Sequence, residues 1–128
     1  MSTIKSAPTV QCPVDYAFQR IGGKYKGRVL WFLKDGVQRY GQMRRVITGI
    51  TPKMLTQVLR ELEDDQLITR KVYLEVPPRV EYTLTETGIA LIPSIQMISK
   101  WGQTQMQQQG ISAMAEGEGE EQTGSLPA

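Results

Sequence analysis

The chain has 128 residues, of which 40% are hydrophobic and 22% are charged, a composition that fits one compact domain of ordinary size. No stretch approaches the roughly 18 uninterrupted apolar residues that a membrane-spanning helix needs. Residues 1–10 also lack the long apolar core of a signal peptide. We therefore expect a soluble, cytoplasmic protein with no membrane partner.

Histidine is absent from the sequence, and Cys12 is its single cysteine. This composition excludes Ser-His-Asp and Cys-His catalysis, internal disulfides and CxxC zinc sites, and we expect neither a metal nor a cofactor. Carboxylates remain available for acid–base chemistry. They cluster at the predicted end of a helix, where a solvated surface without a pocket is the simpler interpretation, so we expect no enzyme; the cluster is Glu61, Glu63, Asp64 and Asp65.

The net charge of +2 conceals an asymmetry along the chain. Residues 1–115 carry all 15 Lys and Arg and nine of the 13 acidic residues, a balance of +6, whereas residues 116–128 carry four Glu and no base. A basic body favours a polyanionic partner. The composition divides the chain into a flexible polar arm (1–11), a folded domain (12–109) and a disordered acidic tail (110–128).

Apolar spacing predicts two helices at the start of the folded domain. The first follows Pro13, carries its apolar residues at i, i+4 and i+7, and stops at Gly22. The apolar run 28–33 has the length of a strand, but Leu30, Leu33 and the turn signal after it favour a buried second helix.

Two further helices are predicted over 41–47 and 51–64. Thr51 suits an N-cap and Pro52 a first helical position, and an apolar stripe at i, i+3, i+4 and i+7 makes the second of these helices strongly amphipathic. The stripe consists of Leu55, Val58, Leu59 and Leu62.

The hydrophobic period then changes. Alternation over 68–75 and 80–84 predicts two strands joined by a proline-containing loop. A long helix follows from Thr85 to about Gln109, in which Pro93 predicts a kink or a short break. The fold class is therefore mainly α with a small β-hairpin. A helix-turn-helix followed directly by a hairpin is a winged helix-turn-helix, whose second helix enters the major groove of DNA.

Four polar side chains share the outer face of the predicted helix 51–64. Gln can read adenine and Arg can read guanine, while Lys and Thr suit phosphates or base edges. Thr51 and the free N–H groups at the helix start suit a phosphate. The same pattern is also typical of an ordinary solvated helix face. The four residues are Lys53, Thr56, Gln57 and Arg60.

Further cations are candidates for contacts with the DNA backbone, or are ordinary surface charges. Arg44 and Arg45 lie on the predicted third helix, and a second group precedes or begins the second helix. In the wing loop, Arg79 follows two stiffening prolines and is placed to enter a narrow minor groove. The second group consists of Lys24, Lys26 and Arg28.

Several segments occur in a characteristic order and spacing: Cys12–Val14, Ile21–Lys26, Val29–Leu33, Gly49–Gln57, Leu59–Glu63 and Glu75–Thr85, with Gly88 after the last. Over about residues 12–102 the chain resembles HxlR-type winged-helix transcription regulators, which are distantly similar to MarR-type proteins. Two residues depart from the family pattern: Tyr25 stands where Trp is common, and Gln66 where Gly is common. Gln in the left-handed conformation that Gly allows would cost roughly 1 kcal/mol, so either the helix cap differs from the family pattern or the strain is tolerated, and the end of the helix 51–64 stays open.

The resemblance implies a homodimer that binds pseudo-palindromic double-stranded DNA sites near promoters. It places the recognition helix at 51–64 and the wing at 73–80. Dimerisation is expected through the N- and C-terminal helices, with a surface that includes Tyr16, Ile92, Ile95, Ile98 and Trp101. The apolar arc of the C-terminal helix is wider than one domain of this size covers, which also favours a partner, although the same stripe would suit the domain's own core.

Some members of the family carry a sensing cysteine at the position of Cys12. The free N–H groups at a helix start favour a thiolate there, and a small molecule, an oxidant or an electrophile, would be the inducer. Alternatively, Cys12 is a small, half-buried residue that packs under the first helix. The function predicted is a sequence-specific, DNA-binding transcription regulator. The competing hypothesis is a winged-helix module that binds protein without reading DNA sequence.

Overall fold

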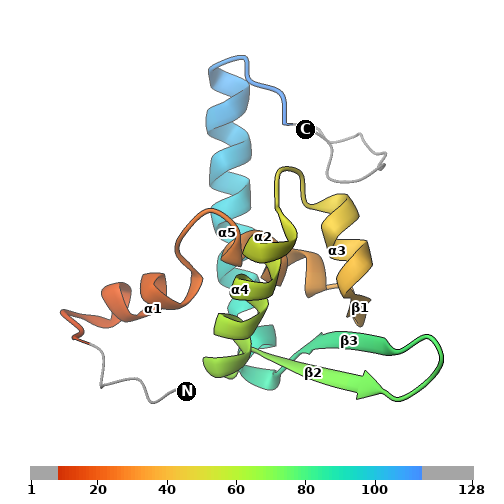
Figure 1. Ribbon diagram of the computed structural model, residues 1–128. Helices are drawn as coiled ribbons and strands as arrows, with labels where there is room; N and C mark the ends of the chain where they lie inside the picture. The colour runs from red at the N-terminus through yellow and green to blue at the C-terminus, as the bar shows by residue number, and fades with distance from the viewer. Residues whose placement is uncertain (1–8, 114–128) are drawn as a thin grey trace.

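The computed structural model describes residues 9–113, which form five helices and a small three-stranded antiparallel sheet (Figure 1). The elements are α1 (Pro13–Ile21), α2 (Lys26–Leu33), β1 (Gln38–Arg39), α3 (Tyr40–Val46), α4 (Pro52–Asp64), β2 (Ile68–Tyr73), β3 (Arg79–Leu84) and α5 (Glu86–Gln108). The β2–β3 hairpin projects from one side, α1 from the other, and α5 extends beyond the rest. Most of the predicted arm and tail lies outside the described residues.

The order and type of the predicted helices are confirmed. The run 28–33 belongs to α2, a helix that buries Val29, Leu30 and Leu33, and not to a strand. Thr51 caps α4, where its Oγ1 accepts a hydrogen bond of 3.1 Å from the Met54 N–H. The apolar stripe of α4 lies in the core, so packing within the same domain holds this helix in place.

The sheet has one strand more than the sequence predicted. β1 pairs with β3 through Gln38 opposite Tyr82, and β3 pairs with β2 through six residues from Ile68–Leu84 to Tyr73–Arg79. The strand order is therefore β1-β3-β2. Two residues are too few to show a period in the sequence, which is why β1 was missed. Strand β2 ends two residues earlier than the predicted strand 68–75, because its pairing with β3 stops at Tyr73.

The long C-terminal helix corrects one expectation. α5 runs from Glu86 to Gln108 through Pro93, so the short break, one of the two effects predicted for this proline, is absent. Thr85 begins it, since its Oγ1 accepts from the Gly88 N–H at 3.0 Å. A Cβ atom at Gly88 would lie 2.2 Å from the Leu67 carbonyl oxygen, so only glycine lets the first turn of α5 approach the start of β2 so closely.

The chain leaves α4 through a left-handed residue. Gln66 has φ 63°, the conformation that glycine would favour. The Gln66 N–H bonds to the Glu63 carbonyl at 2.9 Å and the Leu67 N–H to the Leu62 carbonyl at 3.0 Å, which together make a Schellman motif. The two bonds and the burial of Leu67 offset the local cost of the non-glycine residue. Of the two alternatives, the left-handed conformation is therefore present at Gln66, and α4 ends at Asp64, the last residue of the predicted helix.

The core lies where α2, α3, α4, α5 and the sheet meet. Its fully buried side chains include Leu30, Leu33, Met43, Leu55 and Leu62. Burial also raises the pKa of Tyr82 above its usual value of 10.0, an effect that the nearby Arg70 opposes. None of the helices within residues 9–113 is both long and apolar enough to cross a membrane.

Candidate nucleic-acid interface

The outer face of α4 presents the four side chains that the sequence selected. Lys53, Thr56, Gln57 and Arg60 are all exposed, on the side opposite the buried leucines. Within residues 9–113, neither Lys53 nor Arg60 makes an ion pair, so both cations face solvent without a neutralising carboxylate. The face therefore combines two available positive charges with two hydrogen-bonding side chains, a set suited to a major groove.

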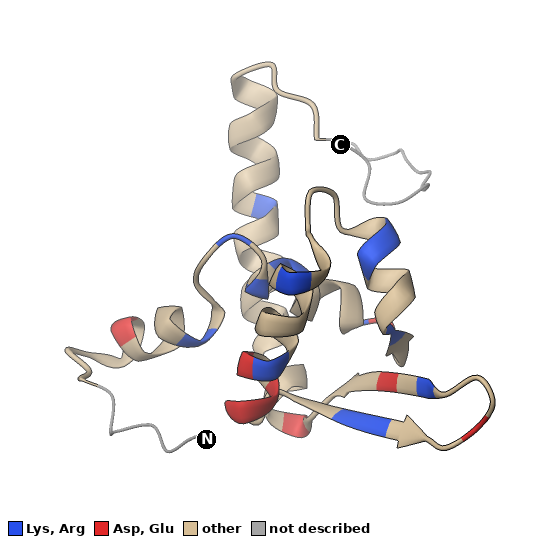
Figure 2. Ribbon diagram, in the orientation of Figure 1, with Lys and Arg blue, Asp and Glu red and all other residues tan. Residues whose placement is uncertain are grey.

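The start of α4 and the end of α3 add to this surface. Because Thr51 Oγ1 accepts from the helix backbone, the hydroxyl hydrogen of Thr51 is left to donate outward. Arg44 and Arg45 lie exposed in the last turn of α3. Figure 2 colours the ribbon by residue type: basic residues, in blue, occur on α3 and along α4, whereas acidic residues, in red, occur at the C-terminal end of α4.

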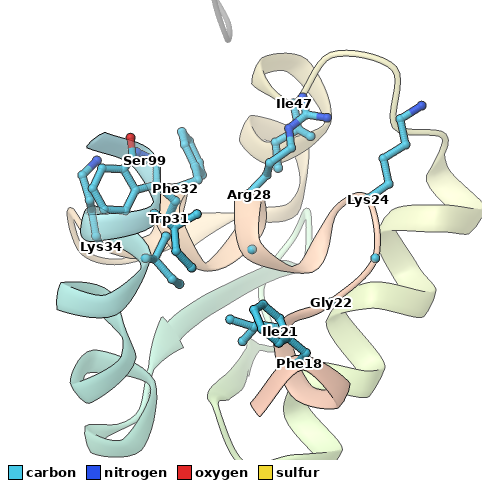
Figure 3. A pocket seen from close by; sticks show the side chains of 14 residues that line it. Phe18, Ile21, Gly22, Lys24, Arg28, Trp31, Phe32, Lys34, Ile47 and Ser99 are labelled. Atoms are coloured by element: carbon cyan, nitrogen blue, oxygen red, sulfur yellow. The ribbon is translucent and has the colours of Figure 1, made fainter. Parts of the chain in front are cut away.

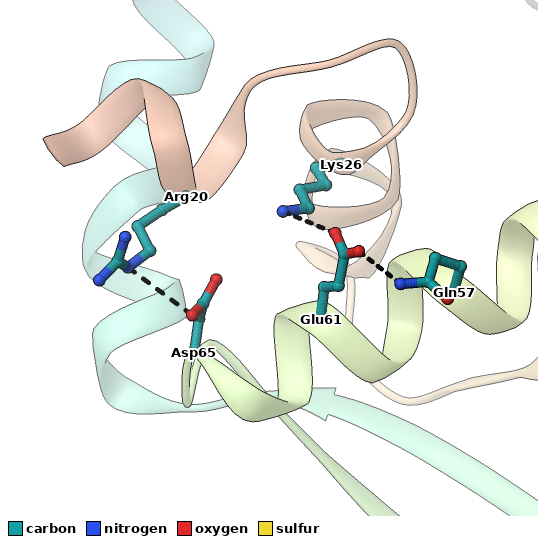
Figure 4. A network of polar contacts seen from close by, with 5 residues as sticks. All are labelled: Arg20, Lys26, Gln57, Glu61 and Asp65. Atoms are coloured by element: carbon teal, nitrogen blue, oxygen red, sulfur yellow. Dashed lines mark hydrogen bonds and ion pairs between the residues drawn. The ribbon is translucent and has the colours of Figure 1, made fainter. Parts of the chain in front are cut away.

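Gln57 is held by a network that the sequence did not predict (Figure 4). Its Nε2 donates to Glu61 Oε2 at 2.5 Å, and Glu61 Oε1 lies 2.9 Å from Lys26 Nζ. Glu61 thus joins α2 to α4 and orients the amide, which keeps its carbonyl oxygen and second N–H for other partners. Lys26, a candidate phosphate contact, is already engaged in this network. Periodicity could not reveal it, because Lys26 lies far from Glu61 in sequence.

Two further carboxylates at the end of α4, those of Glu63 and Asp65, also form ion pairs. Asp65 lies 3.7 Å from Arg20 Nε, and Glu63 lies 3.6 Å from Arg70 Nε. These pairs tie α1 and β2 to the end of α4. Within residues 9–113 no group of three His, Cys, Asp or Glu side chains is arranged to hold a metal ion.

Tyr40 contacts α4, although the sequence offered no reason to select it. Its hydroxyl lies 3.0 Å from the Pro52 carbonyl oxygen and 3.1 Å from Thr56 Oγ1. The first residue of α3 therefore contacts the first two turns of α4 directly. A tyrosine at a strand-to-helix junction carries no pattern from which this contact could be predicted.

The wing differs from the expectation for Arg79. Its guanidinium lies 3.9 Å from the centre of the Tyr73 ring, 3.0 Å from Glu75 Oε2 and 3.7 Å from Glu81 Oε2. The side chain is only 28% exposed. These contacts across the hairpin bind Arg79 to the wing itself, and Arg79 would have to leave them to enter a groove. The wing tip is apolar instead, with Leu74 95% exposed.

The remaining basic candidates lie between α1 and α2 and on α2. Lys24 is exposed, with its Nζ 5.5 Å from the centre of the Tyr25 ring. Arg28 Nη2 donates to the Thr48 carbonyl at 3.2 Å, a bond that ties α2 to the turn between α3 and α4. Arg28 therefore has a structural contact at the turn that precedes α4.

Large apolar side chains are exposed on α1 and α5. Tyr16 is 48% exposed, Ile98 50% and Trp101 67%, and α1 buries none of its residues. The sequence placed Ile92 and Ile95 on the same surface. Ile95 is instead buried in the domain's own core, and Ile92 packs against that core, because their turn of α5 faces α2. The buried residues of α5, Gly88 and Ile95, lie in its first half, and none of the residues in its second half is buried.

An apolar cavity of about 730 Å³ opens between the end of α1, α2 and α5 (Figure 3). Phe18 and Ile21 line it from α1, Trp31 from α2 and Ile98 from α5. The cavity continues the exposed apolar surface of the two terminal helices.

Cys12 lies at the N-cap position of α1, immediately before the exposed face of that helix. Its side chain makes no capping hydrogen bond, and the residue is exposed. The alternative of a half-buried cysteine packed under α1 is therefore wrong. The thiol is open to solvent because α1 itself does not pack deeply on the domain.

A helix-turn-helix whose second helix presents a basic face, followed by a β-hairpin, defines a winged helix-turn-helix protein of the MarR-like kind. The chain belongs to the HxlR-like helix-turn-helix family, whose model matches residues 20–110. It is accordingly a transcriptional regulator of the helix-turn-helix type, and the resemblance seen in the sequence is confirmed.

Individual relatives agree with this assignment. An uncharacterised HTH-type transcriptional regulator of Methanothermobacter thermautotrophicus is 53% identical over 91 residues, covering 71% of this chain and 70% of that protein. The redox regulator HypR in its oxidised form superposes with a TM-score of 0.70 at 45% identity, covering 73% of this chain and 96% of that one. The reduced form of the regulator YodB from Bacillus subtilis gives 0.64 at 35% identity, covering 74% and 94%. These relatives are regulators, not enzymes.

Proposed function

We propose that this chain is a sequence-specific, DNA-binding transcription regulator that acts in the cytoplasm as a homodimer on pseudo-palindromic promoter sites. The observation that carries the proposal is the outer face of α4, where Lys53 and Arg60 are exposed without ion-pair partners among the described residues and flank Thr56 and Gln57. Long-range attraction to phosphates supplies affinity, and the groove-facing side chains supply sequence choice.

In this proposal α4 lies in the major groove. Arg60 reads guanine and Gln57 reads adenine, with Glu61 holding the Gln57 amide in orientation. Thr51, Arg44 and Arg45 contact phosphates on either side of the groove. The wing approaches the neighbouring backbone, and we assign Arg79 to shaping the wing through Tyr73, Glu75 and Glu81 before any minor-groove contact.

The dimer is proposed from the uncovered apolar surface of α1 and the second half of α5. Tyr16, Ile98 and Trp101 form part of this surface, and Ile98 also lines the cavity between α1, α2 and α5. A second copy covering these side chains would bury surface that a lone monomer leaves in water. It would also place two α4 helices for half-sites about one DNA turn apart.

Redox or electrophile sensing through Cys12 is the finer part of the proposal. The exposed thiol at the start of α1 supports it, as does the likeness to a protein described as a redox regulator. With a peroxide as oxidant, the Cys12 thiolate attacks one peroxide oxygen, the O–O bond breaks, and a sulfenic acid forms as the peroxide is reduced to water. A second Cys12 thiol then displaces the hydroxyl to give an intersubunit disulfide and water.

The proposal is tested by fluorescence anisotropy on a labelled duplex from upstream of this protein's own gene, with unrelated DNA as control, over a salt series. We expect a nanomolar dissociation constant for the upstream duplex, with an affinity about 10³-fold or more higher than for the unrelated duplex. Equal and weak binding to both duplexes would contradict it, and pull-down of a protein partner by the same surface would then favour the interaction-module hypothesis. Diamide treatment of wild type and of Cys12→Ser tests sensing: affinity should change only in the wild type.

A further inference from the structure

The Tyr40 hydroxyl has two partners but one hydrogen. It lies 3.0 Å from the Pro52 carbonyl oxygen and 3.1 Å from Thr56 Oγ1. A carbonyl oxygen can only accept a hydrogen bond, so Tyr40 donates to Pro52. The Tyr40 hydrogen is then used, and the 3.1 Å contact requires Thr56 to donate its own hydroxyl hydrogen to the Tyr40 oxygen.

This direction leaves Thr56 with only accepting capacity on the outer side of α4. Its hydrogen points inward to Tyr40, while its oxygen lone pairs remain available at an exposed position. Thr51, the N-cap of the same helix, has the opposite hydrogen-bonding role. Its oxygen accepts from the Met54 N–H, and its hydroxyl hydrogen is left to donate. Two threonines on one helix thus present different hydrogen-bonding chemistry to DNA.

We propose that Tyr40 sets the base preference of this helix by holding Thr56 as an acceptor, an inference that rests on α4 entering the major groove. In that groove the exocyclic amino groups of adenine and cytosine are the donors, whereas guanine O6 and thymine O4 only accept. Thr56 therefore selects adenine or cytosine at the position it contacts. Tyr40 acts through Thr56 as a positioning residue, without touching the base.

A purely structural role of Tyr40 makes a different prediction. Its ring packs against the core, so loss of a packing contact would change stability or affinity for every DNA sequence alike. Removing only the hydroxyl, in Tyr40→Phe, keeps the ring and returns the hydroxyl hydrogen to Thr56. The base preference at one position then changes, while the preferences at the other positions stay as they were.

The test is selection of bound duplexes from a randomised pool, followed by sequencing, for wild type, Thr56→Val, Tyr40→Phe and the double variant. Thr56→Val locates the position, because preference is lost only there. Wild type should prefer adenine or cytosine at that position, and Tyr40→Phe should lower this preference by roughly threefold to tenfold. The double variant should match Thr56→Val, because without the Thr56 hydroxyl Tyr40 has nothing to orient.

Several outcomes would overturn the inference. Wild type could prefer guanine or thymine at the position, Thr56→Val could change no position, or Tyr40→Phe could leave the preference intact. An effect of Tyr40→Phe that persists in the Thr56→Val background would assign Tyr40 a packing role instead. A wild-type protein without base preference at any position would refute the proposed function itself, which separates that failure from the others.

Discussion

Helices α1 and α4 have similar sequence patterns but differ in how deeply their apolar side chains are buried. Both begin with a proline and carry apolar residues at helical spacing. In α4 the stripe is buried, with Leu55 and Leu62 at 0% exposure, whereas in α1 Val14 remains 61% exposed and Phe18 56%. The domain closes its core around α4 and leaves α1 on its outside.

The difference teaches what a helical period can establish. The period identifies the apolar face of a helix, but it does not say which chain covers that face. For α4 the cover is the same domain, through α2, the sheet and α5. For α1 and the second half of α5 we propose a second copy of the chain, so the two regions should respond to substitution in different assays.

The largest effect on the folded domain itself is expected from Leu62→Ala. Leu62 is fully buried, and removing its side chain leaves a cavity in the core. We expect the free energy of unfolding to fall by about 2–5 kcal/mol in urea denaturation, at high and low protein concentration alike. Val14→Ala is the matched control on α1. If Val14→Ala lowered the free energy of unfolding by a comparable amount at every protein concentration, α1 would be part of the domain's own core, which would contradict the account.

Trp101→Glu should act on assembly. A charge placed in the exposed apolar stripe of α5 would be buried by the proposed partner, so we expect the dimer dissociation constant to rise by about a hundredfold or more. Sedimentation at micromolar concentration would then show a monomer with its helical circular dichroism retained. Gln107→Glu, which adds the same charge near the end of α5, serves as the control and should remain a dimer.

Arg45→Ala should reduce DNA affinity without affecting either the core or assembly. Arg45 is exposed on α3 and is proposed to contact a phosphate. Loss of one such contact should weaken binding to specific and unrelated duplexes by about the same factor, roughly threefold to tenfold, and lower the salt slope by about one. A selective loss on the specific duplex alone would instead assign Arg45 to base reading.

The smallest effect is expected where α4 ends. Gln66 has φ 63°, so Gln66→Gly should relieve strain and stabilise the fold by up to about 1 kcal/mol in thermal or urea unfolding. Gln66→Ala keeps a Cβ in the same conformation and should give no such gain. Destabilisation by glycine would show that the Gln66 side chain matters more than its backbone.

Local signals explain which parts of the structure could be predicted. Thr51, Pro52 and the leucine stripe define α4 locally, and a left-handed Gln66 was one of the two alternatives that the departure from the family glycine left open. Contacts between distant segments could not be predicted. The Tyr40 hydroxyl forms a hydrogen bond with Thr56, Lys26 forms an ion pair with Glu61, and the Arg79 guanidinium stacks on the Tyr73 ring. Each of these contacts depends on how separate elements pack.

The wing shows the same limit for a functional residue. From the sequence, Arg79 is simply a cation next to two prolines. Its partners Glu75 and Glu81 are visible in sequence, but the hairpin geometry decides that the guanidinium turns toward them and the Tyr73 ring. Spacing along a helix therefore predicted which side chains of α4 are exposed, whereas residue type alone could not predict the contacts of Arg79 at the start of β3.

The most direct test of the central claim compares two charge reversals by anisotropy on the upstream duplex. Arg60→Glu reverses a cation on the outer face of α4, and Lys100→Glu reverses an exposed cation on α5. If α4 reads DNA, Arg60→Glu should lose specific binding by about a hundredfold or more, while Lys100→Glu should bind within about threefold of the wild type. Equal losses in both variants, or none in Arg60→Glu, would contradict the assignment of α4 as the DNA-reading helix.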